Sequence, residues 1–384
     1  MSLFPQLTAS CKATAAAKQI FSCRLMMNSL GRNALPVNKT NASIQWNVCF
    51  RTGVVSRTFS SSTSAHIGER VNSENQQHQQ QQHLSVRPLR RCLLSVPGHD
   101  PRKVQKAFQI QPDTIVLDLE DGVAGNQKDE ARELVQQTLL TLDDQRDDLG
   151  HSTILSEMCV RINGLETGDL ALHDLEAVLP CRKLQAIVVP KVETAADIHF
   201  VQDQIQEHCT GNVRIIAAVE SAMGILNLRE IAETATVHGG KLDALVFASE
   251  DYMADMEGIR TSHGTELLYA RSKLVTTAKA YGLQAIDMVH IDFRDLQALE
   301  QECLGGVQLG FTGKQAIHPN QVPIIQQSFV PSAKDVDFAT RAIQQYESST
   351  ANGVGACVVD GIVVDLPVYK WCCKIMERAG KPHT

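Results

Sequence analysis

Ionisable residues recur directly after short apolar segments of this sequence, in the places where parallel strands would end. Five successive segments end in this way: Asp118-Leu119-Glu120-Asp121, Arg161-Ile162-Asn163, Pro190-Lys191-Val192-Glu193, Glu220 and Glu250-Asp251. Because the carboxyl ends of barrel strands meet on one face, we expect these side chains to share one rim. Carboxylates buried together need cations. Arg161 and Lys191 supply part of that charge, and a metal ion would supply the rest.

The donor types at this rim indicate a hard metal ion. Carboxylate oxygens without a cluster of His or Cys favour Mg²⁺ or Mn²⁺ over zinc. Any single carboxylate could instead cap a helix or bind a loop, as Glu120 or Asp121 could, so the prediction depends on the ordered set. The stretch Gly310–Pro319 places glycines beside Lys314, which suits phosphate binding. His318 in this stretch could equally be structural.

The apolar segments have the length and composition of strands that are covered on both faces. We expect eight strands, at Cys92–Val96, Thr114–Leu119, Met158–Ile162, Ala186–Val189, Arg214–Val219, Ala244–Phe247, Ala285–Val289 and Gly306–Phe311. Helical patterns lie between them, among them Gln127–Leu142, Thr194–His208, Ala222–Thr236 and Glu266–Tyr281. This alternation predicts a (β/α)₈ barrel. The alternative is a doubly wound sheet, but Ser95-Val96-Pro97-Gly98 is not its G-x-G-x-x-G turn.

The chain after Pro331 has a different pattern. We expect a helix at Ala333–Glu347, a hairpin in which Asp360-Gly361 joins two apolar strands, and a final helix at Leu366–Arg378. The sequence therefore predicts a barrel domain at 89–330 and a small C-terminal segment at 331–384, which the family resemblance given below identifies as a lid.

The first residues have the composition of a targeting segment. Residues 1–68 contain seven Lys or Arg and no Asp or Glu; because the whole chain carries −7, the remainder carries −14. Such a leader predicts a mitochondrial transit peptide at 1–59 and a matrix location, with a disordered basic tail as the alternative. A Gln-rich stretch then predicts a disordered linker at 60–88.

Composition also argues against several classes of protein. An acidic body disfavours binding to nucleic acid. No apolar run approaches the ~18 residues of a membrane span. Eleven cysteines without a C-x-x-C pair suit free thiols in a reducing compartment.

Nine motifs, in order, resemble the HpcH/HpaI aldolase–citrate lyase β family: LLSVPG, VLDLEDGV, VRING, VVPKVE, AAVESAMGI, FASEDY, YARSKLV, LQAIDMVHIDFRD and GFTGKQAIHPNQ. The resemblance extends over residues 89–378 and implies a barrel that binds Mg²⁺ and CoA and assembles as a homotrimer. It makes Glu220 and Asp251 the metal carboxylates and Arg161 the substrate-binding arginine. Asp365 corresponds to a catalytic aspartate on a lid that reaches a neighbouring subunit.

The resemblance also implies a CoA site. Arg102 and Lys106 fall where the family contacts the phosphates of CoA, and Gln315-Ala316-Ile317 matches the backbone segment that meets it. Ser95 stands at a ligand-contacting position where relatives tend to carry an aromatic residue, so a contact through this side chain is open.

Together these residues suit retro-Claisen cleavage of a short 3-hydroxyacyl-CoA, with citramalyl-CoA giving pyruvate and acetyl-CoA. Arg161 can stabilise the oxyanion and Asp365 can act as acid or base, although an Asp before Leu-Pro is also a good N-cap. Malate-synthase-like condensation and thioester hydrolysis are possible side activities. The alternatives are a CoA-independent hydroxy-oxo-acid aldolase and a non-catalytic subunit of a citrate lyase.

Overall fold

The computed structural model describes residues 88–144, 155–209, 211–237 and 239–381. The predicted transit peptide and all but the last residue of the predicted linker lie outside these residues. No helix within the described ranges is long and apolar enough to cross a membrane. No disulfide bond joins the eight cysteines of these ranges.

Eight parallel strands close into a barrel, in the order β1 (Cys92–Pro97), β2 (Thr114–Asp118), β3 (Glu157–Arg161), β4 (Ala186–Val189), β5 (Arg214–Val219), β6 (Leu242–Phe247), β7 (Gln284–Asp287) and β8 (Gly313–Ala316). The barrel closes where β1 pairs with β8, with Leu93 opposite Gln315. The predicted (β/α)₈ barrel is confirmed. The doubly wound alternative is wrong, because an open sheet would leave two strand edges unpaired.

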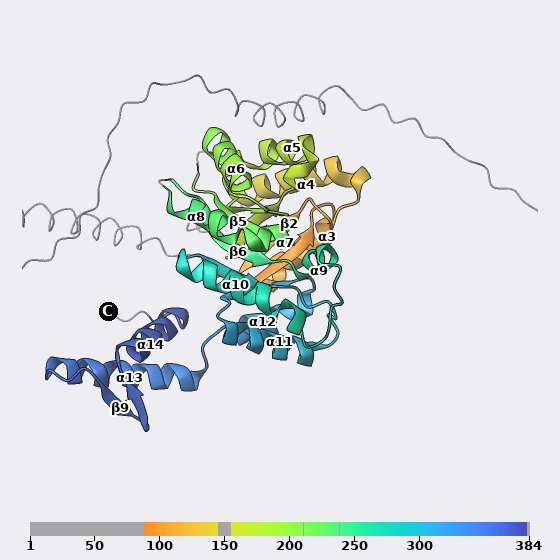
Figure 1. The fold of residues 1–384 in the computed structure, drawn as a ribbon. Coiled ribbons are helices and arrows are strands. Elements are labelled where there is room, and N and C mark those ends of the chain that lie inside the picture. The colour runs from red at the N-terminus through yellow and green to blue at the C-terminus, as the bar shows by residue number, and fades with distance from the viewer. Residues whose placement is uncertain (1–87, 145–154, 210, 238, 382–384) are drawn as a thin grey trace, which may run out of the picture. The chain divides into compact units, whose positions relative to one another are not determined.

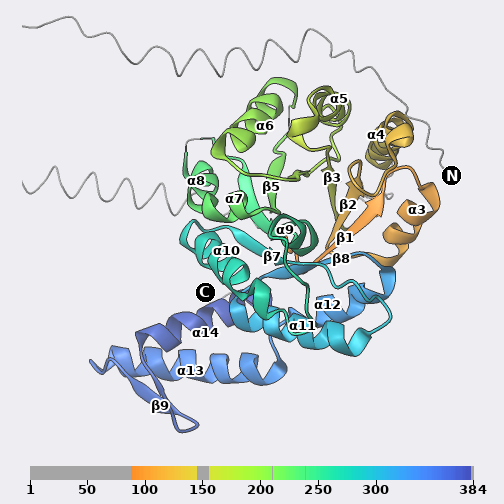
Figure 2. The same ribbon diagram turned by 45° about the vertical axis from the view of Figure 1, so that its right-hand side comes forward.

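Helices surround the strands, as Figures 1 and 2 show. The outer ring contains α3 (Pro101–Ile110), α4 (Lys128–Asp144), α5 (Asp169–Val178), α6 (Ala195–His208), α8 (Leu228–Glu233), α10 (Leu268–Ala280), α11 (Leu296–Leu309) and α12 (Val322–Ser328). One apolar cluster fills the space between strands and helices, and a smaller one fills the barrel interior. Strands covered on both faces must be apolar almost throughout, which explains why the sequence pattern revealed them.

Two predicted elements need correction. The expected eighth strand, Gly306–Phe311, is wrong: its first residues are the last turn of α11, which ends at Leu309 and is capped by Gly310 with a left-handed φ of 100°. The true β8 begins at Gly313, where an added Cβ would lie 1.9 Å from a backbone oxygen of Arg90. A glycine-led, polar strand gives no apolar signal. The helix expected at Ala222–Thr236 is also interrupted, because it divides at Asn227 into α7 (Ala222–Leu226) and α8.

A buried ion cluster occupies the amino-terminal end of the barrel. Arg90, just before β1, is 1% exposed. Its guanidinium donates to both carboxylate oxygens of Glu157, at 2.7 and 2.6 Å, and pairs with Asp243. The hydroxyl of Thr114 also donates to Glu157, at 2.9 Å. This end of the barrel is thus closed by a cluster in which each charge has a partner.

The predicted C-terminal segment of helix, hairpin and helix is present. It consists of α13 (Ala333–Ala351), β9 (Cys357–Val359), β10 (Ile362–Val364) and α14 (Leu366–Arg378), and it has an apolar core of its own. Asp360 and Gly361 have φ of 51° and 80°, as the central residues of a type I′ turn require. In Figures 1 and 2, α13 lies outside the ring of barrel helices.

The Arg90 cluster generates a stability prediction. Arg90→Met leaves Glu157 and Asp243 buried without their cation, and this should cost about 3–5 kcal/mol of unfolding free energy. Denaturant unfolding measures the loss. Arg229→Met, which removes an exposed cation of α8, is the control and should change stability little. A loss below ~1 kcal/mol at Arg90 would contradict the role assigned to the cluster.

Candidate active site at the carboxyl ends of the strands

Charged side chains point toward the barrel axis at the carboxyl ends of β2, β3 and β5. In each strand the residue two positions earlier belongs to the interior cluster, so Asp118, Arg161 and Glu220 lie on the same inner face above it. The predicted convergence of rim residues is therefore observed. It places polar groups directly on top of an apolar barrel interior.

Arg161 is held by two carboxylates, one at the end of β2 and one in the loop that follows it. Its Nε and Nη2 donate to the two oxygens of Asp118, both at 2.6 Å, and its Nη1 lies 3.0 Å from Glu120. Asp118 also accepts from the backbone N–H groups of Glu120 and Gly122. These contacts fix the plane of the guanidinium and leave part of its five-donor fork for a ligand.

Glu120 is buried between two cations. Lys191 Nζ lies 2.9 Å from one of its oxygens, and Arg161 lies 3.0 Å from the other. Both contacts are ion pairs, so the two cations hold this buried carboxylate in place. Lys191 itself has a left-handed φ of 52°, a conformation that costs about 1–3 kcal/mol and often marks a functional site.

Glu220 is the rim carboxylate whose ionised form is most disfavoured by its surroundings. It is 5% exposed. Burial raises its pKa to about 8, and the charges of Glu120 and Asp251 add to that rise, while Arg161 and the backbone N–H of Lys191 oppose it. Asp251, on α9 (Ser249–Asp255), is exposed at the same rim. The site therefore has more negative charge than its own cations neutralise.

This donor set fits a hard divalent cation. Two carboxylates of the rim act on each other, because the charge of the exposed Asp251 adds to the rise that burial causes in the pKa of Glu220. Among the described residues, no three His, Cys, Asp or Glu side chains form a metal site by themselves. Mg²⁺ does not need such a group, because it retains water and substrate oxygens beside one or two protein carboxylates.

The residues expected to contact CoA lie around the same rim. Arg102 and Lys106 are exposed on α3, one helical turn apart, and Ser95 lies on the inner face of β1. In the segment Gln315-Ala316-Ile317, the N–H of Ile317 already donates to Gln321 at 2.9 Å. A ligand can meet this segment only through its other groups.

Lys314 does not fit the phosphate-binding interpretation of its stretch. It is fully buried, donates to the carbonyl of Met288 at 2.7 Å and pairs with Glu302. A phosphate could not reach it. His318 stacks on Phe293 with ring centroids 4.5 Å apart and accepts from the N–H of Asn320, so its observed role is structural.

Asp365 lies on the C-terminal segment and not in the cluster of rim charges. It is exposed and caps α14, accepting from the N–H of Val368 at 3.1 Å. Within the part of the chain that the structure describes, no hydrogen bond or ion pair connects Asp365 to Arg161, Glu220 or Asp251. Its capping function is thus observed directly.

Sequence reasoning named Lys191 only as a source of positive charge and Glu120 only as a possible helix cap or loop contact, and it gave Asp118 no individual role. It placed all three at the rim, and their strand-end positions were the available signal. The sequence could not show that Asp118 orients Arg161, because that pairing depends on the register between β2 and β3, where these two residues are opposite each other.

Comparison with known proteins agrees with this geometry. The sequence profile of the HpcH/HpaI aldolase/citrate lyase family matches residues 91–319. The chain is 40% identical over 291 residues to human mitochondrial citramalyl-CoA lyase, covering 73% of this chain and 83% of the relative. It is 34% identical to citrate lyase subunit beta of Leuconostoc mesenteroides subsp. cremoris, covering 77% and 95%. CitE from Mycobacterium tuberculosis, solved with magnesium, acetoacetate and coenzyme A, superposes with a TM-score of 0.60 at 29% identity, covering 76% and 98%.

The free-energy cost of burying the Glu220 carboxylate leads to a prediction in two parts. Glu220→Gln removes a buried, poorly neutralised carboxylate, so the melting temperature without metal should rise. The same change should abolish the stabilisation that Mg²⁺ gives by binding the native state. Thermal unfolding with and without Mg²⁺ measures both effects.

Two comparisons interpret this result. Asp251→Asn, at an exposed position, should lose the Mg²⁺ effect with little change in metal-free stability. Glu230→Gln, on the surface of α8, should behave as the unmodified chain. If Mg²⁺ still stabilises Glu220→Gln fully, this carboxylate does not hold the metal.

Proposed function

The chain belongs to the HpcH/HpaI aldolase/citrate lyase family, and from this premise we propose that it cleaves citramalyl-CoA to pyruvate and acetyl-CoA. It is a carbon–carbon lyase of the (β/α)₈ class that uses Mg²⁺ and a CoA thioester. The observation that carries the proposal is the charge at the rim. The buried Glu220 and the exposed Asp251 have too little positive charge near them, and they lie beside Arg161, which Asp118 holds in place. The specific substrate is supported by the human relative of that name.

Different residues of the chain would have different roles in the reaction. Glu220 and Asp251 would hold Mg²⁺, which when bound supplies a Lewis acid for the adjacent carboxylate and hydroxyl of the substrate. Arg161, oriented by Asp118, can donate to the oxygen on which negative charge develops as the carbon–carbon bond breaks. Because these donors are fixed before the reaction, little reorganisation is required.

The CoA part of the substrate would lie across the rim near β1 and β8. Arg102 and Lys106 offer two exposed cations to its phosphates, in a chain whose net charge is otherwise negative. The segment Gln315-Ala316-Ile317 would contact the CoA along its backbone. Ser95, small and on the inner face of β1, leaves this part of the rim open.

The C-terminal segment would act as a lid that serves a second copy of the chain in a homotrimer. Val358 and Val363 are opposite each other on the hairpin and are 65% and 61% exposed, and the adjacent Ile362 is 51% exposed. An exposed apolar face of this kind suits contact with another subunit. Asp365 follows this hairpin directly, so docking of the hairpin would carry its carboxylate to a neighbouring rim.

The proposed location is the mitochondrial matrix. The acid-free leader and the mitochondrial relatives support it, as do the free thiols of the described ranges. The leader would be removed after import, within the residues before the barrel.

A direct assay tests the proposed reaction. The purified chain with citramalyl-CoA and Mg²⁺ should release pyruvate and acetyl-CoA in equal amounts, and EDTA should abolish the release. Free citramalate should not be cleaved, because the CoA-binding cations would have no ligand. Cleavage of free citramalate would favour the CoA-independent aldolase, and activity that requires an added acyl carrier protein would favour the citrate lyase subunit.

Asp365 offers a sharper test because its structural role is known. Asn caps a helix about as well as Asp, so Asp365→Asn should leave the melting temperature unchanged. If Asp365 transfers a proton, kcat should fall by roughly 10²-fold or more. Unchanged kcat would remove Asp365 from the mechanism.

The same variant tests whether sites are shared between subunits. Mixing inactive Asp365→Asn chains with inactive Glu220→Gln chains under subunit exchange should restore part of the activity, because some sites combine an intact lid with an intact rim. No recovery after verified exchange would place lid and rim in one chain.

A further inference from the structure

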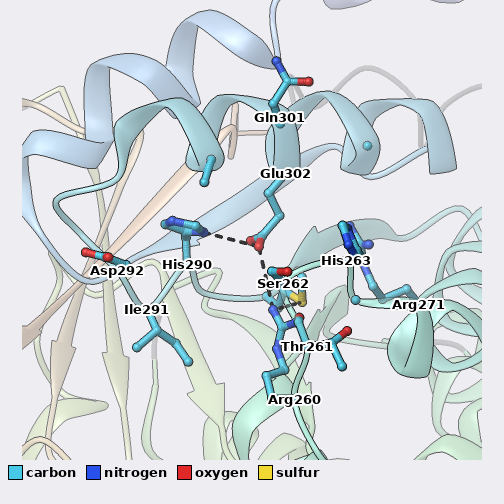
Figure 3. A pocket seen from close by; sticks show the side chains of 14 residues that line it. Arg260, Thr261, Ser262, His263, Arg271, His290, Ile291, Asp292, Gln301 and Glu302 are labelled. Atoms are coloured by element: carbon cyan, nitrogen blue, oxygen red, sulfur yellow. Dashed lines mark hydrogen bonds and ion pairs between the residues drawn. The ribbon is translucent and has the colours of Figure 1, made fainter.

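Basic side chains from three different segments meet at Glu302, on α11. Its carboxylate pairs with Lys314 of β8, which is completely buried. It also lies 3.3 Å from Nδ1 of His290, after β7, and 3.7 Å from Nη2 of Arg260, after α9. Figure 3 shows the Glu302 side chain extending from its helix to a point between His290 and Arg260.

One side of this network leads to the metal carboxylates. The Nε of Arg260 lies 3.5 Å from Glu250, which immediately precedes Asp251 on the same helix. Arg260 also lies 3.5 Å from Glu266. The guanidinium of Arg260 therefore bridges Glu302 to the helix that carries Asp251.

The other side leads to the segment expected to meet CoA. Lys314 is the residue directly before Gln315-Ala316-Ile317 in β8. A second connection passes through Gln321, which is fully buried. Its amide nitrogen donates to the carbonyl of His290 at 2.8 Å, and its oxygen accepts from the N–H of Ile317 at 2.9 Å.

A cavity of about 640 Å³ lies beside these contacts. It lies between the two loops that the contacts join, the one after α9 and the one after β7. Its lining includes Arg260, Thr261, His290, Ile291 and Glu302 (Figure 3). Side chains do not fill this space. Within the cavity there is therefore no apolar packing that could hold the two loops at a fixed distance from each other. The ion pairs of Glu302 span the two loops, together with one contact at 3.6 Å between Nη2 of Arg260 and Sδ of Met288.

We propose that Glu302 is a positioning residue that sets the distance between the Asp251 side of the site and the CoA segment. Glu302 itself touches neither ligand. The inference rests on the proposed function, which places the metal at Asp251 and CoA at Gln315-Ala316-Ile317. Without Glu302 each half of the site still binds its own ligand, but the two ligands are misaligned, and an error of about 1 Å can cost on the order of 10² in rate.

The test must separate positioning from the neutralisation of a buried lysine. Glu302→Gln alone leaves Lys314 buried without its counter-ion and should be strongly destabilising. Glu302→Gln/Lys314→Met removes both charges together and should recover most of that stability. In the double variant we expect the dissociation constants of Mg²⁺ and of CoA, measured by calorimetry without turnover, to change by less than about threefold, while kcat falls roughly 10²-fold.

Controls fix the meaning of each outcome. Glu233→Gln/Arg229→Met removes an exposed ion pair from α8 and should leave all three quantities unchanged. A kcat within about threefold of the unmodified chain in the stable double variant would show that Glu302 only neutralises Lys314. Loss of Mg²⁺ or CoA binding would show that Glu302 supports one half of the site directly, which also overturns the proposal.

A second variant covers failure of the double variant to fold. Arg260→Met breaks the connection to Glu250 while Lys314 keeps its partner, and it should give the same pattern of intact binding and reduced kcat. Unchanged kcat in Arg260→Met would overturn the proposal. An unmodified chain that turns over no thioester would refute the proposed function instead, whereas an active unmodified chain with an unaffected variant refutes only the positioning role.

Discussion

The rest of this structure depends on the cost of holding several carboxylates at one end of an apolar barrel. Asp118, Glu120 and Glu220 are all buried above the barrel interior. Each must find positive charge close by, because burial alone penalises an ionised group by several kcal/mol. Arg161 and Lys191 satisfy Asp118 and Glu120. Glu220 has no ion pair within the described residues, and this deficit is the reason that we propose the rim as the site of a cation.

The two ends of the barrel treat buried charge in opposite ways. At the amino-terminal end, Arg90 pairs with Glu157 and Asp243, and the cluster gives stability without access for a ligand. At the carboxyl end, burial raises the pKa of Glu220, and Lys191 is held in a left-handed conformation. A barrel fold allows this division because loops after the strands can vary while loops before the strands keep the framework closed.

Residues that do not contact a ligand set the proposed distances between the parts of the site. Glu302 joins the β6 and β7 loops to β8 through Arg260, His290 and Lys314. The C-terminal segment has its own core, so it can move or dock as a unit without opening the barrel. Under the proposed function, metal binding, CoA binding and proton transfer would therefore lie on separate elements, as suits a substrate much longer than the bond that is broken.

The sequence alone determined the barrel, the type I′ hairpin and the rim residues, because each has a local cause. Strands covered on both faces are continuously apolar, Asp360-Gly361 suits positive φ, and charges follow the strands directly. Only the tertiary structure decided the rest. The sequence analysis misplaced strand β8 because its first residue, Gly313, must be a glycine to fit against the backbone of Arg90, which is far away in sequence. Lys314 looked free for phosphate, but Glu302 and Met288 enclose it. The pairing of Asp118 with Arg161 follows from strand register, which no single segment encodes.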